Sequence, residues 1–328
     1  MLNIRKKLRH TLLCGSIGLL LTAVPLASQA QNYPNRPITV VTFVPNGSAP
    51  DAIFRAVAVE LGKDLGQEVV VENRPGGGGT VSARHVRNSK PDGYTVLLNG
   101  SSRLLSALAR GESEDAFAGL TPVSSMIAVP MAFAVRSDLE VENLDDFVQL
   151  ARKNPKEISY ASTGIGSIAH VYGELMSRNA DIEILHAPYN QTANSYTDLI
   201  GKRIHSIFST VGTLRPFVEA GQVKLLGVTG ETRTSAVPEV PTFEEQGYKG
   251  MDVIAWNGVF VPEGTSAEII DRLGQALQKA AKNPSIRELA NGFGMEMTGS
   301  SPEEFGESLD KERDYWAKVI QETGIKIE

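Results

Sequence analysis

The chain has almost no cysteine. Cys14 is the only one among 328 residues, and it lies in the apolar stretch TLLCGSIGLLLTAVPL near the start of the chain. Basic residues precede this stretch and the small-residue site SQA follows it, which is the pattern of a cleaved secretory signal peptide. We therefore predict a signal peptide over residues 1–30 and a mature chain without a disulfide, a thiolate metal site or a cysteine nucleophile. Lipidation of Cys14 is disfavoured, because the bulky Leu13 precedes it.

Positive charge is also in deficit. The formal net charge is −6, and removal of the four basic residues of the signal peptide makes it −10. A chain of this charge is not expected to bind nucleic acid, whose backbone is recognised by clustered lysine and arginine. Because a negative field repels anions at long range, an anion site on this chain must depend on local dipoles.

The sequence lacks the spacing of metal sites and of hydrolase motifs. The histidines of the mature chain are His85, His170, His186 and His205. They form neither HExxH nor another metal-ligand spacing, and GxSxG is absent. We therefore predict no metal, no cofactor and no catalytic residue. Ser167 and His170 are expected to form a local hydrogen bond, so a secreted hydrolase is the weakest of the alternatives.

The segment NRPGGGGT, residues 73–80, is not expected to bind a nucleotide. It follows a strand-like run and precedes a helical pattern. However, it lacks the Lys-Ser/Thr of a P-loop and the acidic residue that a dinucleotide fold places about twenty positions further on. Its four glycines permit close approach of a ligand or of a neighbouring helix, and the sequence leaves both explanations open.

Strand-like runs alternate with helical patterns from residue 31 onward. This alternation is typical of βαβ units, and the length exceeds what a single core usually supports, so we predict two α/β lobes. Two crossings, near 124–130 and 250–258, are expected to join a lobe made of 31–125 plus 256–328 to a lobe made of 126–255. They would form a hinge beside an interlobe cleft, and Trp256 is expected to pack in that hinge.

Two loops rich in Gly, Ser and Thr connect a predicted strand to a predicted helix, within 38–51 and 158–170. The first turn of a helix has free backbone N–H groups and partial positive charge, so such loops accept carboxylates. Taken alone, the first loop is better explained as a turn in which Asp51 caps the helix, whereas binding and turn chemistry explain the second equally well. Together, the two loops suit a diacid.

Ten segments, in this order, carry a resemblance to a known family. They are YPNRPITVV, FVPNG, VVVENRPGGGGT, KPDGYTVLL, YASTGIGSIAH, HAPYNQ, IGKRI, AGQVKLLGVT, VPEVPTFEEQG and WNGVFVPEGT. The chain resembles the Bug-type periplasmic solute receptors of tripartite tricarboxylate transporters over essentially its whole length. The resemblance implies a type II periplasmic-binding-protein fold that closes like a Venus flytrap. It also implies a periplasmic, monomeric protein that delivers small carboxylates to the membrane permease subunits of a tripartite transporter.

The resemblance further implies which residues bind the ligand. In such receptors, one loop from each lobe holds a ligand carboxylate through backbone amides and ordered water. On this chain the first group is Phe43, Pro45, Asn46, Gly47, Ser48 and Asp51. The second group is Ser162, Thr163, Gly164, Gly166, Ser167 and His170. Candidates for the distal end of the ligand are Ser101, Ser102, Tyr189 and Asn190.

Two departures from the family pattern bear on the ligand. The first loop is one residue longer than usual, with Asn46 where the family carries glycine, and Ser209 and Thr210 stand where many relatives carry Asp. Loss of that carboxylate disfavours an ammonium group, so we predict a mono- or dicarboxylate without a required positive charge. The alternative function is a ligand sensor that docks onto a histidine kinase without transport. Both functions need the same cleft.

Overall fold

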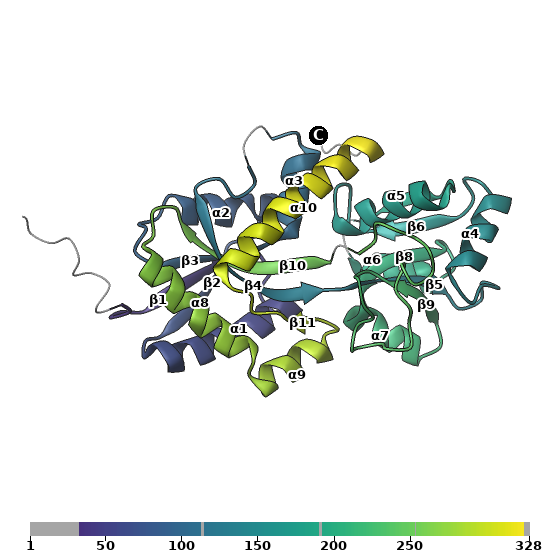
Figure 1. The fold of residues 1–328 in the computed structure, drawn as a ribbon. Helices are drawn as coiled ribbons and strands as arrows, with labels where there is room; N and C mark the ends of the chain where they lie inside the picture. Colours follow the sequence, from purple (N-terminus) through teal and green to yellow (C-terminus); the bar gives the residue numbers. More distant parts are fainter. Residues whose placement is uncertain (1–32, 113–114, 190–191, 253, 325–328) are drawn as a thin grey trace, which may run out of the picture.

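The computed structural model describes residues 33–112, 115–189, 192–252 and 254–324, which form two α/β lobes (Figure 1). The predicted signal peptide and Asn190 lie outside the described residues. Within the described part of the chain, no helix combines the length and the apolar character that a membrane span requires. Each lobe contains one sheet with helices packed on it, so the prediction of a two-lobed α/β fold is confirmed.

A six-stranded sheet forms the first lobe, in the order β11-β4-β10-β3-β1-β2. The strands are β1 (Ile38–Thr42), β2 (Val69–Asn73), β3 (Thr95–Gly100), β4 (Leu120–Val129), β10 (Ala255–Pro262) and β11 (Glu296–Met297). β1 is parallel to β2 and β3, whereas β10 is antiparallel to β3 and β4. The β-branched sequences ITVVT and VVVEN favour the extended conformation of β1 and β2.

Helices cover both faces of this sheet (Figure 1). One face carries α1 (Ala49–Leu65), α8 (Ala267–Ala281) and α9 (Pro284–Gly292). The other carries the short 3₁₀ helix η2 (Gly77–Gly79), α2 (Thr80–Arg87), α3 (Ser101–Ala109) and α10 (Pro302–Thr323). Phe54, Val57, Leu61 and Leu65 of α1 recur every three or four residues and are buried, as an amphipathic helix on a sheet requires.

A five-stranded sheet forms the second lobe, in the order β7-β6-β8-β5-β9. The strands are β5 (Met131–Arg136), β6 (Ser159–Ser162), β7 (Leu185–Pro188), β8 (Ser206–Thr210) and β9 (Val223–Val228). The helices are α4 (Leu144–Lys153), α5 (Ile168–Ala180), α6 (Thr192–Ile200) and α7 (Val211–Glu219). β6 is parallel to β7 and β8, so the carboxyl ends of these three strands share one edge.

The two crossings between the lobes lie side by side. β4 ends at Val129 and β5 begins at Met131, so the chain leaves the first sheet at Pro130. It returns at Ala255, which pairs with Val129. β4 thus stays in the first sheet beyond the predicted boundary at residue 125, and the division of the chain into lobes stays a prediction.

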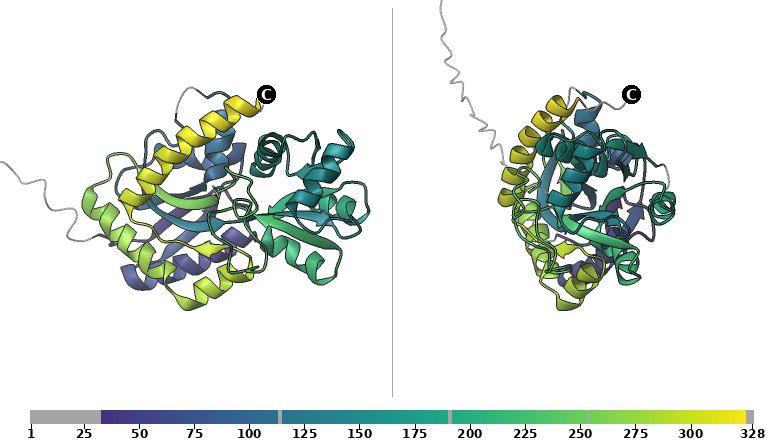
Figure 2. Two further views of the ribbon diagram at one scale, coloured as in Figure 1. Left: turned by 45° about the vertical axis from the view of Figure 1, so that its right-hand side comes forward. Right: turned by 90° about the vertical axis from the view of Figure 1, so that its right-hand side faces the viewer.

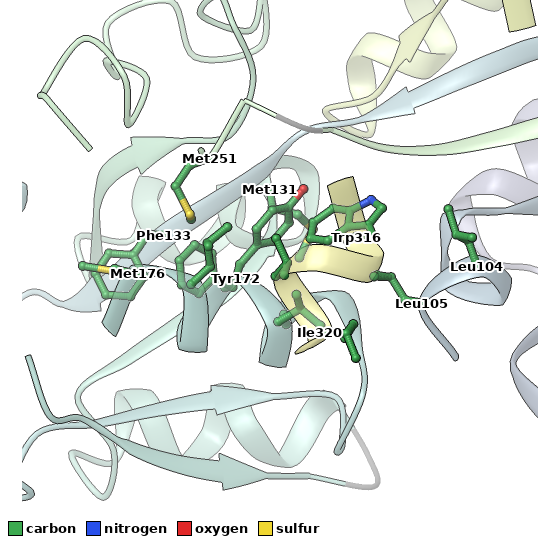
Figure 3. Close-up of a cluster of buried hydrophobic side chains, with 14 of the residues drawn as sticks. Leu104, Leu105, Met131, Phe133, Tyr172, Met176, Met251, Trp316 and Ile320 are labelled. Carbon is green, nitrogen blue, oxygen red and sulfur yellow. The ribbon is translucent and has the colours of Figure 1, made fainter. Parts of the chain in front are cut away.

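Helix α10 packs against both lobes. It runs over the first lobe and contacts α5 of the second (Figure 2). Figure 3 shows Trp316 and Ile320 of α10 near Tyr172 of α5 and Leu105 of α3, in one buried cluster. The rings of Trp316 and Tyr172 meet edge to face at 5.9 Å. Burial of this apolar surface stabilises the observed arrangement of the lobes.

The lobes also touch near the start of α7. A Cβ at Gly212 would overlap the backbone of Phe293 of the first lobe, so only glycine permits this approach. Thr234 of the second lobe donates a hydrogen bond to Glu296 of β11 at 2.9 Å. Contacts on both sides of the crossings therefore hold the lobes together.

The fold bears on the prediction for Trp256 and on the two explanations that the sequence left open for the glycine segment. Trp256 is buried against Phe117 and Phe305, and its Nε1 donates to Glu312 at 2.6 Å, which is the packing role predicted for it. The glycine segment packs tightly on its own lobe: a Cβ at Gly79 would collide with the buried side chain of Asn99. Packing against neighbouring elements accounts for that glycine without a ligand.

Candidate ligand-binding site

The predicted binding residues lie where parallel strands end. The first loop, residues 43–48, follows β1, and α3 begins directly after the neighbouring strand β3. The second loop, residues 163–167, follows β6, and β6 lies between β7 and β8 in its sheet. Because parallel strands end at a common edge, each lobe gathers its candidate residues at one edge of its sheet, which is where α/β proteins bind ligands.

Ser48 is the residue of the first loop with an unused polar group. It is the N-cap of α1, but its side chain makes no capping hydrogen bond. Its Oγ is buried and has no hydrogen-bond partner among the described residues. Buried polar atoms are nearly always paired, so an unpaired hydroxyl at a helix start indicates a place for a ligand atom or a water.

Asp51 holds the first loop in shape. Its carboxylate is 2% exposed and accepts hydrogen bonds from the Gly47 N–H at 3.0 Å, Arg55 Nε at 2.9 Å and Asn73 Nδ2 at 2.7 Å. Burial disfavours ionisation, but the hydrogen bonds from Arg55 and Asn73 hold the pKa of Asp51 below its ordinary value. These contacts make Asp51 a positioning residue, and its predicted contact with ligand stays a prediction.

Asn73 is a contributor to this loop that the sequence analysis missed. Its Nδ2 also donates to the carbonyl oxygen of Val44 at 3.0 Å, and its Oδ1 accepts from Arg55 at 2.7 Å. Asn73 is the last residue of β2, the strand beside β1. An amide at the end of a neighbouring parallel strand was the signal that could have identified it.

The other candidates of the first lobe differ in exposure. Pro45, Asn46 and Gly47 are exposed, and Phe43 is half-buried. Ser101 is buried, and its Oγ accepts a hydrogen bond from the Trp256 N–H at 3.3 Å, so its side chain ties α3 to β10. Ser102 is exposed.

The second loop is bonded within itself. Ser162 Oγ lies 2.6 Å from His186 Nε2, accepts from the Gly164 N–H at 3.1 Å and lies 3.0 Å from the Gly164 carbonyl oxygen. Ser167 Oγ caps α5 by accepting from the His170 N–H at 3.3 Å. The Gly166 N–H donates to His170 Nδ1 at 3.0 Å. The predicted local bond between Ser167 and His170 is thus confirmed.

His170 and His186 form a stacked pair that the sequence analysis missed. Their ring centroids are 3.9 Å apart and the rings are nearly parallel. Burial, reinforced by the neighbouring His170, lowers the pKa of His186 to about 4. Burial also lowers the pKa of His170, against the opposing effect of Glu174. The pair is therefore neutral near pH 7, and since His170 Nδ1 accepts a hydrogen bond, its proton is on Nε2.

Thr163 and Tyr189 are the remaining candidates of the second lobe among the described residues. Thr163 is exposed, and the neighbouring Ile165 is 57% exposed although it is apolar. The Tyr189 hydroxyl donates a hydrogen bond to Asp198 at 2.7 Å, so its proton is already used within the protein. The two departures from the family pattern are the last two residues of β8. Ser209 is buried and bonded to the Tyr196 hydroxyl, whereas Thr210 is paired with Thr213.

The start of α5 reaches the first lobe. Ile168, directly after the second loop, packs against the buried cluster of the first sheet that contains Val129 and Ala255. It also packs against the central cluster that contains Trp316.

Within the described residues, no group of three or more His, Cys, Asp and Glu side chains is arranged to hold a metal ion. The arrangement offers neutral hydrogen-bond donors at two helix starts.

Comparison with known proteins gives the family. A family model described as "Tripartite tricarboxylate transporter family receptor" matches residues 53–325. The chain belongs to this receptor family. Its relatives include the UPF0065 protein in the tcbD-tcbE intergenic region of Pseudomonas sp. strain P51, 32% identical, with 96% of this chain and 94% of the relative covered. Protein BugT of Bordetella pertussis is 29% identical, with 97% and 99% covered.

Solved structures agree with this assignment. The periplasmic binding protein BugD is 29% identical with a TM-score of 0.73, covering 90% of this chain and 100% of that one. Rpa4515 of R. palustris, solved with adipate, is 28% identical with a TM-score of 0.75, covering 90% and 99%. MatC of Rhodopseudomonas palustris, solved with malate, is 25% identical with a TM-score of 0.72, covering 88% and 100%.

These findings confirm three predictions. The chain is a Bug-type receptor of the tripartite tricarboxylate transporter family, and it has the periplasmic-binding-protein fold. The family and its structural neighbours are solute-binding receptors, so the chain is a receptor and not an enzyme.

Proposed function

We propose that this receptor captures a small organic carboxylate in the periplasm, between its first and second loops, and presents it to the membrane subunits of a tripartite transporter. The unpaired, buried Oγ of Ser48 at the start of α1 is the observation that carries the proposal. Two structural neighbours that cover nearly the whole chain were solved with adipate and with malate, which supports a carboxylate ligand.

The first loop supplies donors that suit a carboxylate. The Ser48 hydroxyl can donate one hydrogen bond, and the first turn of α1 adds N–H groups and the positive end of the helix dipole. The negative charge of Asp51 is paired with the positive charge of Arg55, so it does not cancel this field. A ligand anion at Ser48 therefore meets a neutral donor beside a locally positive helix end.

The second loop favours a ligand without an ammonium group. His170 and His186 are neutral near pH 7, and Ser209 and Thr210 stand where many relatives carry Asp. The exposed Ile165 adds an apolar surface near the exposed Thr163 in the same loop. An aliphatic mono- or dicarboxylate matches these groups, because its chain is apolar and its ends accept hydrogen bonds.

A binding screen with one variant tests the proposal. The purified protein is unfolded, refolded to release any captured ligand, and screened by thermal shift against mono-, di- and tricarboxylates and amino acids. An acid that binds the folded state raises Tm. Calorimetry should then show about tenfold weaker binding for Ser48→Ala, because a hydrogen bond to a charged group is lost. Ser285→Ala, an exposed serine on α9, is the control and should bind like the native protein.

Two outcomes would overturn this function. Tight binding of aspartate or glutamate without any response to plain acids would contradict the ligand class. Native-like affinity of Ser48→Ala for a bound acid would contradict the role of the first loop.

Transport is tested separately. Deletion of the receptor gene should abolish cellular uptake of the same acid. Unchanged uptake would indicate a receptor that serves a signalling partner.

A further inference from the structure

The start of α7 meets the first lobe backbone to backbone. A Cβ at Gly212 would overlap the carbonyl group and the Cα of Phe293, the residue that follows α9. From the other side, a Cβ at Gly294 would overlap the backbone nitrogen of Gly212 and would lie 2.9 Å from Val211 Cβ. We call these four residues, Val211, Gly212, Phe293 and Gly294, the glycine contact. Two segments of different lobes thus approach more closely than a Cβ on either glycine would allow.

The glycine contact lies at the edge of the second sheet that carries the second loop. β8 ends at Thr210, directly before α7, and β6 ends at Ser162, directly before the second loop. β6 and β8 are parallel neighbours, so α7 and the second loop start from the same edge. Ile168, directly after the second loop, also packs against the first lobe. The glycine contact therefore affects the distance between the second loop and the first lobe.

Hydrogen bonds to a side chain accompany the glycine contact. Thr234 Oγ1 and the Ser235 N–H of the second lobe both donate to Glu296 Oε1, at 2.9 and 3.3 Å. Glu296 follows Gly294 by two residues, so these bonds and the glycine contact join the same two parts of the chain. A glutamate side chain can follow a small shift by changing its rotamer, whereas two backbones in contact cannot. The glycine contact is therefore the feature that sets the spacing of the lobes here.

We propose that Gly212 is a positioning residue for ligand capture, because its lack of a side chain lets the lobes reach the arrangement in which both loops bind one ligand. This inference rests on the proposed function, since a ligand held between the two loops needs them at a fixed distance. The apparent affinity of a receptor is its intrinsic affinity multiplied by the fraction of molecules in the binding arrangement. A Cβ at Gly212 would block that arrangement, so it would lower this fraction and the affinity.

Gly212→Ala is the direct test, because it adds one methyl group at the contact. Gly212 is a helical residue of α7 without a left-handed φ, and alanine favours a helix more than glycine does. The variant should therefore fold, which circular dichroism checks. Calorimetry with the acid found in the screen should show about tenfold weaker binding, because overpacking a close contact costs free energy of that order. The larger side chain of Gly212→Leu should weaken binding further.

Gly292→Ala is the matched control. Gly292 is also a helical glycine without a left-handed φ, at the end of α9, and a Cβ there would meet no atom within 4 Å. This variant should bind the acid like the native protein. Gly294→Ala is less suitable as a test, because the φ of +67° is itself strained for alanine. Native affinity in Gly212→Ala, or an equal loss in Gly292→Ala, would overturn the proposal.

A distance measurement separates this proposal from the identity of the ligand. Cys14 is the only native cysteine and lies in the predicted signal peptide, so Val59→Cys of α1 and Leu185→Cys of β7, both exposed, place one spin label on each lobe. Pulsed electron double resonance should show a changed label distance in Gly212→Ala, a larger change in Gly212→Leu and the native distance in Gly292→Ala. An unchanged distance in Gly212→Leu would overturn the proposal. If no acid binds, a changed distance would support the role of the contact and place the failure in the proposed carboxylate function.

Discussion

The first and second loops connect a strand to a helix in the same way, but they use their serines differently. Ser48 and Ser167 are both N-caps, yet Ser167 accepts a capping hydrogen bond and Ser48 does not. The first loop is shaped by a charged residue, Asp51, which leaves the serine free. The second is shaped by its own hydroxyls and by neutral histidines. Similar sequences can therefore produce one loop with an unused donor and another that is already satisfied.

Removal of the Asp51 carboxylate should have the largest effect. Asp51→Ala removes one hydrogen-bond acceptor from each of Arg55, Asn73 and the Gly47 N–H, so the first loop loses its shape. We expect the free energy of unfolding to fall by about 3 kcal/mol. This is at the low end of the loss that follows when a buried ion pair is broken, because Arg55 is partly exposed. Urea denaturation measures it, and carboxylate binding should be lost as well.

Asp310→Ala is the matched control, because this aspartate pairs with Arg313 at the surface. Its removal should change the free energy of unfolding by less than about 0.5 kcal/mol. Similar losses for Asp51→Ala and Asp310→Ala would show that the first loop does not depend on its buried carboxylate, and the contrast between the loops would fail.

The second loop should instead respond to acid. The pKa of His186 is lowered to about 4 in the folded protein, so the unfolded state binds its proton more readily. The neutral His186 therefore makes its full contribution to the unfolding free energy above about pH 6.5, and this contribution is lost as the pH falls toward 4. The loss is at most about 2 kcal/mol, because the side chain is partly exposed. His186→Gln should flatten the dependence of unfolding free energy on pH in this range.

Glu312 also titrates in this pH range, so the native protein must be compared with His186→Gln. Burial raises its pKa to about 7, so its contribution to stability is lost in the opposite direction, as the pH rises from about 4.5 to 7. The dependence of the unfolding free energy on pH in the native protein therefore includes both groups. The contribution of His186 is obtained by subtracting the unfolding free energy of His186→Gln from that of the native protein at each pH. Parallel profiles for the two proteins would contradict the assignment of a buried, neutral His186.

Substitution of the two serines at N-cap positions, Ser48 and Ser167, should give the smallest effect on stability. Ser167→Ala removes the cap of α5 and should lower the free energy of unfolding by about 1 kcal/mol. Ser48→Ala removes a hydroxyl that makes no hydrogen bond, so the unfolding free energy should not fall. Denaturant titration compares them, and an equal loss in both variants would mean that Ser48 also caps its helix.

The sequence predicted well what depends on local spacing. The alternation of strands and helices and the bond between Ser167 and His170 follow from short-range patterns, and both are present. It did not predict Asn73 or His186, because their partners, Asp51 of α1 and His170 of α5, are distant in the sequence and meet them only when the sheets form. Asp51 was expected to cap α1 but supports the loop instead, since Arg55 and Asn73 reach it from outside the turn.

A crystal structure of the receptor with the acid found by the thermal-shift screen would show directly whether Ser48 binds the ligand. We expect a ligand carboxylate oxygen within hydrogen-bond distance of Ser48 Oγ, with the opposite side of the ligand facing the second loop. A bound acid that leaves Ser48 Oγ without a partner, or that lies away from residues 43–48, would contradict it.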